Sequence, residues 1–106
     1  MRTGTASQGQ TKARRDAAKS TLLLQAAVQE HRTGRLDEAA VLYRRILKAQ
    51  PRHPDALHLL GLVEHARGSH AEALRLVERA IAAASNVAAF HVAHGTILLA
   101  LDRSEA

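Results

Sequence analysis

A fixed internal spacing of 34 residues is the feature that most constrains how this chain can fold. Three positions of one short motif recur at that distance: Gly34, Glu38 and Ala39 return as Gly68, Glu72 and Ala73. Three further pairs share the spacing: Leu23 with Leu57, Arg45 with Arg79, and Gly61 with Gly95. A period of this length is typical of repeat proteins whose units are helical hairpins, and it excludes most enzyme folds built on one central core.

Helical patterning accompanies the repeats from Ser20 onward. Gly34 and Gly68 supply stops, and Pro51 and Pro54 separate two helices because proline cannot continue a helix but fits its first turn. Five helices are expected, over residues 20–33, 37–49, 54–67, 71–84 and 88–101. The sequence therefore predicts an all-α fold, an α-solenoid of helix-turn-helix hairpins with about two and a half units.

Positive charge is concentrated at the N-terminus. The chain carries a formal net charge of +5, and residues 1–19 hold five basic side chains against Asp16 alone. The remaining residues are almost neutral, and Tyr43 and Phe90 are the only aromatic residues apart from histidine, so we do not expect nucleic-acid binding. We expect residues 1–19 to form a basic, flexible tail, disordered up to about Lys12, with helix starting between Lys12 and Ser20.

The chain contains no cysteine. This excludes disulfides, thiolate metal sites and cysteine nucleophiles. No run reaches the roughly 18 apolar residues needed to span a bilayer, and the N-terminus has no apolar stretch of signal-peptide length. We therefore expect no membrane partner and a cytoplasmic location.

Aligned at the 34-residue spacing, the chain resembles the tetratricopeptide repeat. That pattern has a large residue, Leu-Gly and a bulky residue on its first helix, and Ala, Phe and Pro on its second. The clearest copy matches at Leu57, Leu60, Gly61, Ala73, Val77 and Ala80; the preceding copy matches at Leu23, Ala26, Ala27, Ala39, Tyr43 and Pro51; a partial third copy has His91, His94, Gly95 and Leu98. The resemblance implies a first repeat over 20–53, a second over 54–87 and the first helix of a third over 88–106.

Two features of the repeats bear on packing. The small residues Gly61 and Ala73 let the two helices of a hairpin approach closely. Glu30 and Glu64, in contrast, stand where the repeat family has a bulky aromatic residue. These departures predict looser packing at the two glutamates without changing the fold.

The run from His53 to Gly61 indicates which tetratricopeptide-repeat proteins this chain resembles. Its sequence, HPDALHLLG, looks like the repeat arrays that precede the catalytic domains of bacterial relatives of O-linked N-acetylglucosamine transferases and of some sulfotransferase-like proteins. No catalytic domain is expected within these residues, and we expect the chain itself not to be an enzyme. The resemblance implies two alternatives: a protein-interaction scaffold, or the partner- or substrate-recruiting N-terminal segment of a larger glycosyltransferase-like or sulfotransferase-like enzyme.

In tetratricopeptide superhelices the first helix of each hairpin lines the concave face, where a peptide or partner helix binds. The resemblance implies a largely aliphatic groove lined by Leu24, Gln25, Val28, His31, Asp55, His58, Leu59, Leu62, His65, Val92, Thr96 and Leu99. Relatives that bind the acidic C-termini of chaperones use Lys, Asn and Arg on this surface. The matching positions here are Leu24, Val28, Leu59, Ala89 and Ala93, so we expect a hydrophobic or amphipathic protein or peptide as the ligand.

Histidine is the one residue type that suggests a metal. His91 and His94 lie three residues apart on one helix face, which is a possible chelate, but the sequence places no third ligand beside them. We therefore expect neither a metal site nor a cofactor.

The last predicted helix raises the question of what covers it. Ala106 falls where the second helix of a third repeat would begin, so Phe90, Ile97 and Leu101 are expected to lack the partner that normally buries them. Exposed apolar side chains at the end of a solenoid favour association. We therefore expect self-association through the C-terminal helix, as a two-fold homodimer or by exchange of the terminal helix, or else that the chain is a fragment of a longer array.

Overall fold

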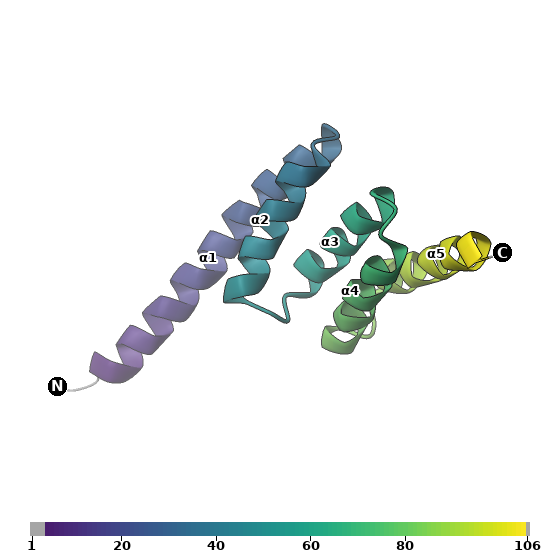
Figure 1. Cartoon of the computed structure of the whole chain (residues 1–106). Helices are drawn as coiled ribbons and strands as arrows, with labels where there is room; N and C mark the ends of the chain where they lie inside the picture. The colour runs from purple at the N-terminus through teal and green to yellow at the C-terminus, as the bar shows by residue number, and fades with distance from the viewer. Residues whose placement is uncertain (1–3, 106) are drawn as a thin grey trace.

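The computed structural model describes the backbone of residues 4–105 and the side chains of residues 11–103. The described chain consists of five helices and no strand: α1 (Gly4–Arg32), α2 (Leu36–Ala49), α3 (Pro54–Ala66), α4 (His70–Ala83) and α5 (Ala88–Glu105). The helices follow one another as a row of antiparallel neighbours (Figure 1). The predicted all-α solenoid is confirmed, and no described helix is both long and apolar enough to cross a membrane.

The two predicted glycine stops form matching turns. Gly34 and Gly68 have φ values of 83° and 88°, in the left-handed region that glycine adopts without strain. In each turn the glycine N–H donates to a carbonyl of the last helical turn, from Gly34 to His31 at 3.1 Å and from Gly68 to His65 at 3.0 Å. The hairpins α1–α2 and α3–α4 are thus closed in the same way, as the repeat spacing predicts.

The start of α1 differs from the expectation. The helix begins at Gly4, so the expected flexible tail is helical from that residue onward, and Met1 to Thr3 lie outside the described residues. Residues 12–19 contain mainly Lys, Arg and Ala, which are strong helix formers, and no proline interrupts them. Since α2 holds the C-terminal half of α1, this stretch continues an established helix and extends past the end of α2 (Figure 1).

Small residues at the helix crossings, together with a few large ones, form the core. Ala27, Ala39 and Ala73 are fully buried, and Gly61 lies against α4. The only two aromatic residues apart from histidine, Tyr43 and Phe90, are buried in the same cluster, which spans α1 to α5. A second, smaller cluster joins Ala73 and Val77 of α4 to Ala93 and Ile97 of α5, and Ile81 packs against both clusters. Each hairpin therefore shares buried contacts with the next, as expected of a solenoid.

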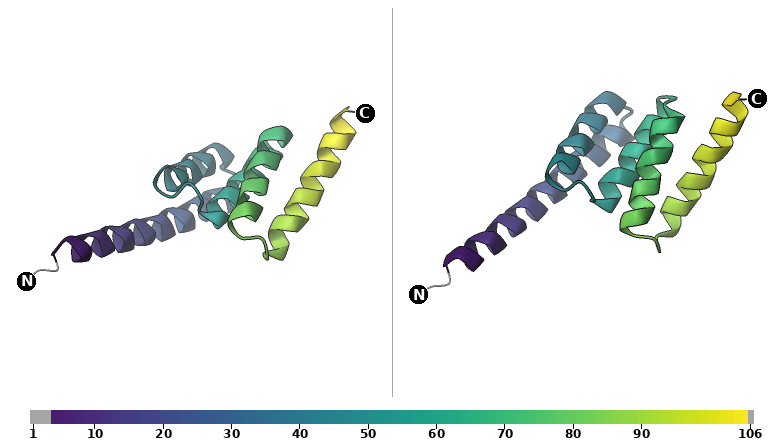
Figure 2. Two further views of the ribbon diagram at one scale, coloured as in Figure 1. Left: turned by 90° about the horizontal axis from the view of Figure 1, so that it is seen from below. Right: turned by 60° about the horizontal axis from the view of Figure 1, so that its bottom comes forward.

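The expected exposure of the C-terminal helix is wrong in its details. Phe90 and Ile97 are buried, with exposed fractions of 2% and 0%, and Leu101 is half-buried. Helix α5 lies along α4 and also contacts α3 (Figure 2), and Ile97 packs in a cluster with Ala73 and Val77. These three residues are covered because the preceding hairpin alone buries one side of α5.

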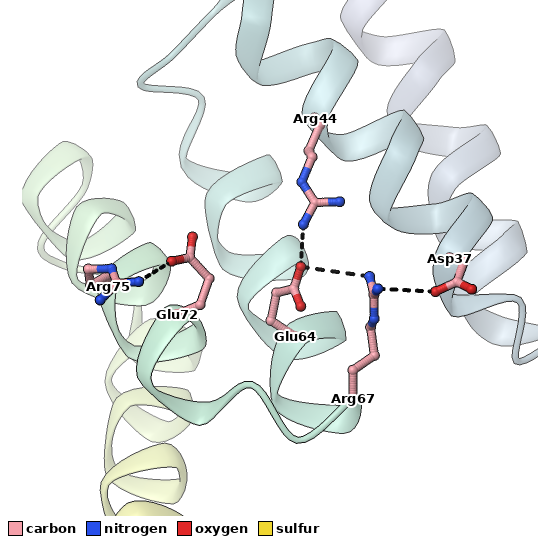
Figure 3. Close-up of polar contacts among 6 residues, drawn as sticks. All are labelled: Asp37, Arg44, Glu64, Arg67, Glu72 and Arg75. Atoms are coloured by element: carbon pink, nitrogen blue, oxygen red, sulfur yellow. Dashed lines mark hydrogen bonds and ion pairs between the residues drawn. The ribbon is translucent and has the colours of Figure 1, made fainter.

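A buried carboxylate links the two hairpins at the position where the repeat pattern has an aromatic residue. Glu64 of α3 is 4% exposed and accepts from Arg44 of α2. Arg67 lies 3.8 Å from the same carboxylate and 3.3 Å from Asp37 of α2 (Figure 3). Looser packing at Glu64 is therefore not observed, since two guanidinium groups satisfy the buried charge.

The repeat offers a matched pair of glycines for testing helix packing. A Cβ built on Gly61 would lie 2.7 Å from Val77 Cγ2 and 3.3 Å from the Ala73 carbonyl oxygen, whereas one built on Gly95 has no neighbour within 4 Å. We expect Gly61→Ala to lower the free energy of unfolding by about 1–3 kcal/mol through overpacking. Gly95→Ala is expected to raise it by about 0.5–1 kcal/mol, because alanine favours a helix interior over glycine.

Urea unfolding followed by circular dichroism measures both changes. Equal free energies of unfolding for the two variants would contradict the close contact between α3 and α4 at Gly61.

Candidate functional site

A hollow of about 380 Å³ lies between α3 and α5, the first helices of successive repeats. Its lining residues are His58, Leu62, His65, Ala89, Val92, Ala93, Thr96 and Ile97. Five of them belong to the predicted groove: His58, Leu62, His65, Val92 and Thr96. No lysine, arginine or carboxylate lines the hollow, so its surface is mainly apolar with histidines on the α3 side.

Helical periodicity explains why these residues meet. His58, Leu62 and His65 are spaced by four and three residues, which places them on one face of α3. Val92 and Thr96 are four residues apart on α5, and Val92 is 68% exposed. The two stripes face the same hollow, where the Val92 side chain is available to a ligand.

The structure places the other predicted groove residues elsewhere. Leu24 and Leu59 are half-buried and pack against the core, so these side chains contribute to packing within the chain and do not line the hollow. On α1, Gln25 is exposed and Val28 is half-buried, while the His31 Nδ1 lies 3.4 Å from the Tyr43 hydroxyl. Asp55 is exposed on the first turn of α3, and Leu99 is 59% exposed but outside the hollow. The residues on α1 therefore do not share this hollow.

His58 forms part of the contact between the two helices. Its ring centroid lies 4.8 Å from that of Phe90, at an interplanar angle of 41°. Burial lowers the pKa of His58 below its ordinary value, and the nearby Asp55 carboxylate offsets part of this change. The neutral ring is therefore the form that packs best on Phe90.

Sequence reasoning missed a second histidine contact at the rim. The Nδ1 atoms of His65 and His70 lie 2.9 Å apart, joining the end of α3 to the start of α4. The two residues are five apart across the Gly68 turn, a spacing that helical periodicity alone does not bring together. This contact orients the His65 ring at the edge of the hollow.

The two histidines of α5 whose spacing suggests a chelate contact different partners. His91 Nε2 lies 2.7 Å from the Ser85 carbonyl oxygen, and His94 Nε2 lies 3.2 Å from a carboxylate oxygen of Glu78. Within the described residues, no group of three or more His, Cys, Asp or Glu side chains is placed to hold a metal ion. Both rings thus contact neighbouring parts of the chain.

Comparison with known proteins agrees with this architecture. A family model described as tetratricopeptide repeat matches residues 24–89. Among solved structures, the chain is similar to a mutant of the O-GlcNAc transferase of Thermobaculum terrenum, with 34% sequence identity and a TM-score of 0.78. The match covers 79% of this chain and 16% of that chain. Sequence comparison with curated proteins finds no match.

The lowered pKa of His58 predicts acid sensitivity. The unfolded chain binds the proton at the ordinary histidine pKa of about 6.5, above the pKa of the folded form. The stability contribution of neutral His58 is therefore complete above that pH and is lost as the pH falls through it towards the folded pKa. We expect the urea midpoint to fall less steeply between neutral and mildly acidic pH for His58→Gln than for the unaltered chain.

Asp55→Asn serves as the second arm of this test. It removes the charge that favours protonated His58, so acid should destabilise this variant more steeply than the unaltered chain. Identical pH dependence in all three proteins would contradict the assigned role of His58.

Proposed function

Because the chain belongs to the tetratricopeptide-repeat family, whose repeats generally mediate protein–protein interaction, we propose that it is a scaffold that binds a peptide or partner helix in the hollow between α3 and α5. The observation that carries this proposal is the mainly apolar surface of the hollow, whose lining includes five predicted groove positions. An apolar hollow on the surface of a small helical domain favours an amphipathic helix or an extended peptide with aliphatic anchors.

The chemistry of the hollow argues against an acidic C-terminus as the ligand. Ala89 and Ala93 form part of its wall, and Leu24 and Leu59 pack into the core. These are the positions where carboxylate-binding relatives would need cationic or amide side chains. A carboxylate placed here would lose its hydration without gaining a charged donor, so an aliphatic side chain is the better occupant.

The alternative proposal places the same groove in a larger enzyme. The similarity to an O-GlcNAc transferase supports a role as the partner- or substrate-recruiting segment of a glycosyltransferase-like or sulfotransferase-like protein. The tetratricopeptide repeat is itself a non-catalytic fold, so any such activity would reside outside these residues. The expected cytoplasmic location stays a prediction under both alternatives.

We propose that a homodimer forms through α5, on a different face of the helix from the one that the sequence predicted. His91, His94, Gly95 and Leu98 correspond, at the repeat spacing, to Leu57, Leu60, Gly61 and Glu64, all of which are buried in α3. On α5 these positions are exposed, except for the half-buried His94, and no helix within residues 4–105 packs over Gly95. A second copy could pack its own α5 on this face, since glycine permits close approach of two helices.

The groove proposal is tested with peptides selected from a displayed random library against the full chain. We expect the selected sequences to contain aliphatic residues at helical or alternating spacing. Val92→Glu should weaken a selected peptide at least about tenfold, because it brings an unpaired carboxylate against the apolar wall. Leu22→Glu is the matched control, since Leu22 is 67% exposed, Val92 is 68% exposed, and Leu22 lies on α1 outside the hollow.

Fluorescence anisotropy measures the affinities, and circular dichroism checks that both variants fold. Selection of acidic C-termini, or equal binding by the two variants, would rule out the proposed groove.

Self-association is tested separately by light scattering as a function of concentration. Leu98→Lys should shift the chain towards monomer, because Leu98 is 44% exposed in the middle of the proposed face. Val41→Lys, at an apolar residue of α2 that is 56% exposed, should leave the molar mass unchanged. A monomer at all concentrations would remove the homodimer while leaving the groove proposal intact.

A further inference from the structure

A second hollow lies at the other end of the molecule, between α1 and the C-terminal end of α2. It has a volume of about 310 Å³ and is lined by Asp16, Lys19, Ser20, Leu23, Arg45, Lys48 and Ala49. An adjoining surface hollow, lined by Lys12, Arg15, Asp16 and Lys19, continues it along α1. No residue of either hollow belongs to the groove between α3 and α5.

The charges of this region are unbalanced. Five cationic side chains surround the two hollows, whereas Asp16 is the single carboxylate and lies 3.9 Å from Lys12. Among the described side chains, Arg15, Lys19, Arg45 and Lys48 make no ion pair. Residues 1–10, which precede them, contain no acidic residue. This basic hollow therefore has excess positive charge that the described chain does not neutralise.

Arginines elsewhere in the molecule are only partly paired. Arg35, Arg44 and Arg67 each lie within ion-pair distance of a carboxylate. Arg32 and Arg103 have no such partner among the described side chains, so the basic hollow differs by gathering several unpaired cations in one place. The negative end of the helix macrodipole explains a basic residue such as Lys48 in the last turn of α2. It gives no such reason for Lys12 and Lys19, which lie in the interior of α1.

The arrangement of the cations follows the packing face of α1. Lys12, Asp16, Lys19 and Leu23 are spaced by four, three and four residues, so they share one side of the helix. Leu23, at one end of this set, packs against the core where α1 contacts α2. Helix α2 ends at Ala49, and α1 extends past that end (Figures 1 and 2). The face of α1 that contacts α2 therefore carries cationic side chains where it continues beyond α2.

We propose that this basic hollow is a second docking site, which binds an acidic polypeptide segment of a partner protein along α1 beyond the end of α2. Complementary charge is the basis of recognition: aspartate and glutamate side chains would pair with Lys19, Arg45 and Lys48. Leu23 and Ala49 supply a short apolar floor for the aliphatic parts of those side chains.

A nucleic acid fits the same surface less well. Single-stranded nucleic acid is bound by stacking its bases on aromatic side chains, but Tyr43 and Phe90 are both buried. Double-stranded nucleic acid needs a longer row of phosphate contacts than these two hollows provide. The site therefore favours carboxylates carried on a polypeptide.

The test uses a fluorescently labelled polyglutamate peptide and the full chain at low salt. We expect binding that weakens as salt is added, and no binding of a polyglutamine peptide of equal length. Arg45→Glu combined with Lys48→Glu should weaken polyglutamate binding at least about tenfold, because two attractive charges become repulsive.

A second double variant separates local recognition from net charge. Arg32→Glu with Arg103→Glu makes the same change in net charge, also near helix C-termini, at two exposed residues away from the basic hollow. It should retain polyglutamate affinity within about threefold, a small electrostatic effect for distant charges. Circular dichroism confirms that both variants stay helical.

Three outcomes would overturn the proposal: no binding of polyglutamate, equal weakening in the two double variants, or tighter binding of a nucleic-acid oligonucleotide or an anionic vesicle than of polyglutamate. Because the peptide groove shares no residue with the basic hollow, none of these results would decide the groove proposal.

Discussion

Close approach of paired helices at small side chains is the constraint on which the rest of this structure depends. Gly61 leaves no room for a Cβ against Val77, and Ala73 on the facing helix is fully buried. The two large aromatic side chains fill space beside these crossings, where Tyr43 lies next to His31 of α1 and Phe90 lies next to His58 of α3. A chain with so few aromatic residues can therefore still build a buried core, because its helices approach closely and leave little space between them to fill.

The ion pair between Glu64 and Arg44 adds a second constraint on how the hairpins pack. A buried carboxylate carries a desolvation cost that a guanidinium partner repays only with good geometry, so the contact is weak evidence for added stability. Its consequence is orientational, because losing Arg44 would leave Glu64 buried between α2 and α3 with only the more distant Arg67 as a partner. Of the many angles at which two helical hairpins can stack, those that separate Glu64 from Arg44 are disfavoured. The relative position of the hairpins is thus constrained by the ion pairs of Glu64 with Arg44 and of Arg67 with Asp37, together with apolar packing.

Local patterns in the sequence predict much of this fold. The turns at Gly34 and Gly68 and the ends of the first four helices follow from residue type, and four of the five helices start within one residue of expectation. Helix α5 extends to Glu105, four residues past its expected end. Local patterns do not reveal which neighbour covers a given face. Phe90 and Ile97, expected to be exposed because no following helix would cover them, are buried by the preceding hairpin, and Leu59, expected to line the groove, is half-buried against the core. The extent of α1 was missed for a different reason: a polar, alanine-rich stretch is stable as helix only when it continues a packed one.

The two proposed surfaces differ in the physics of recognition. The groove between α3 and α5 is apolar and without fixed charge, so binding there would depend on burial and little on salt. The basic hollow offers mostly exposed cations, so binding there would be fast, weak and sensitive to ionic strength. They lie towards opposite ends of an elongated molecule that measures 66 Å along its longest axis (Figure 1). A partner with both an acidic segment and an aliphatic anchor would bind the second site at a raised effective concentration once the first is occupied, provided that its linker spans the distance between them. Selectivity for such a partner would then arise from two modest contacts whose separation depends on the packing of α2 against α3.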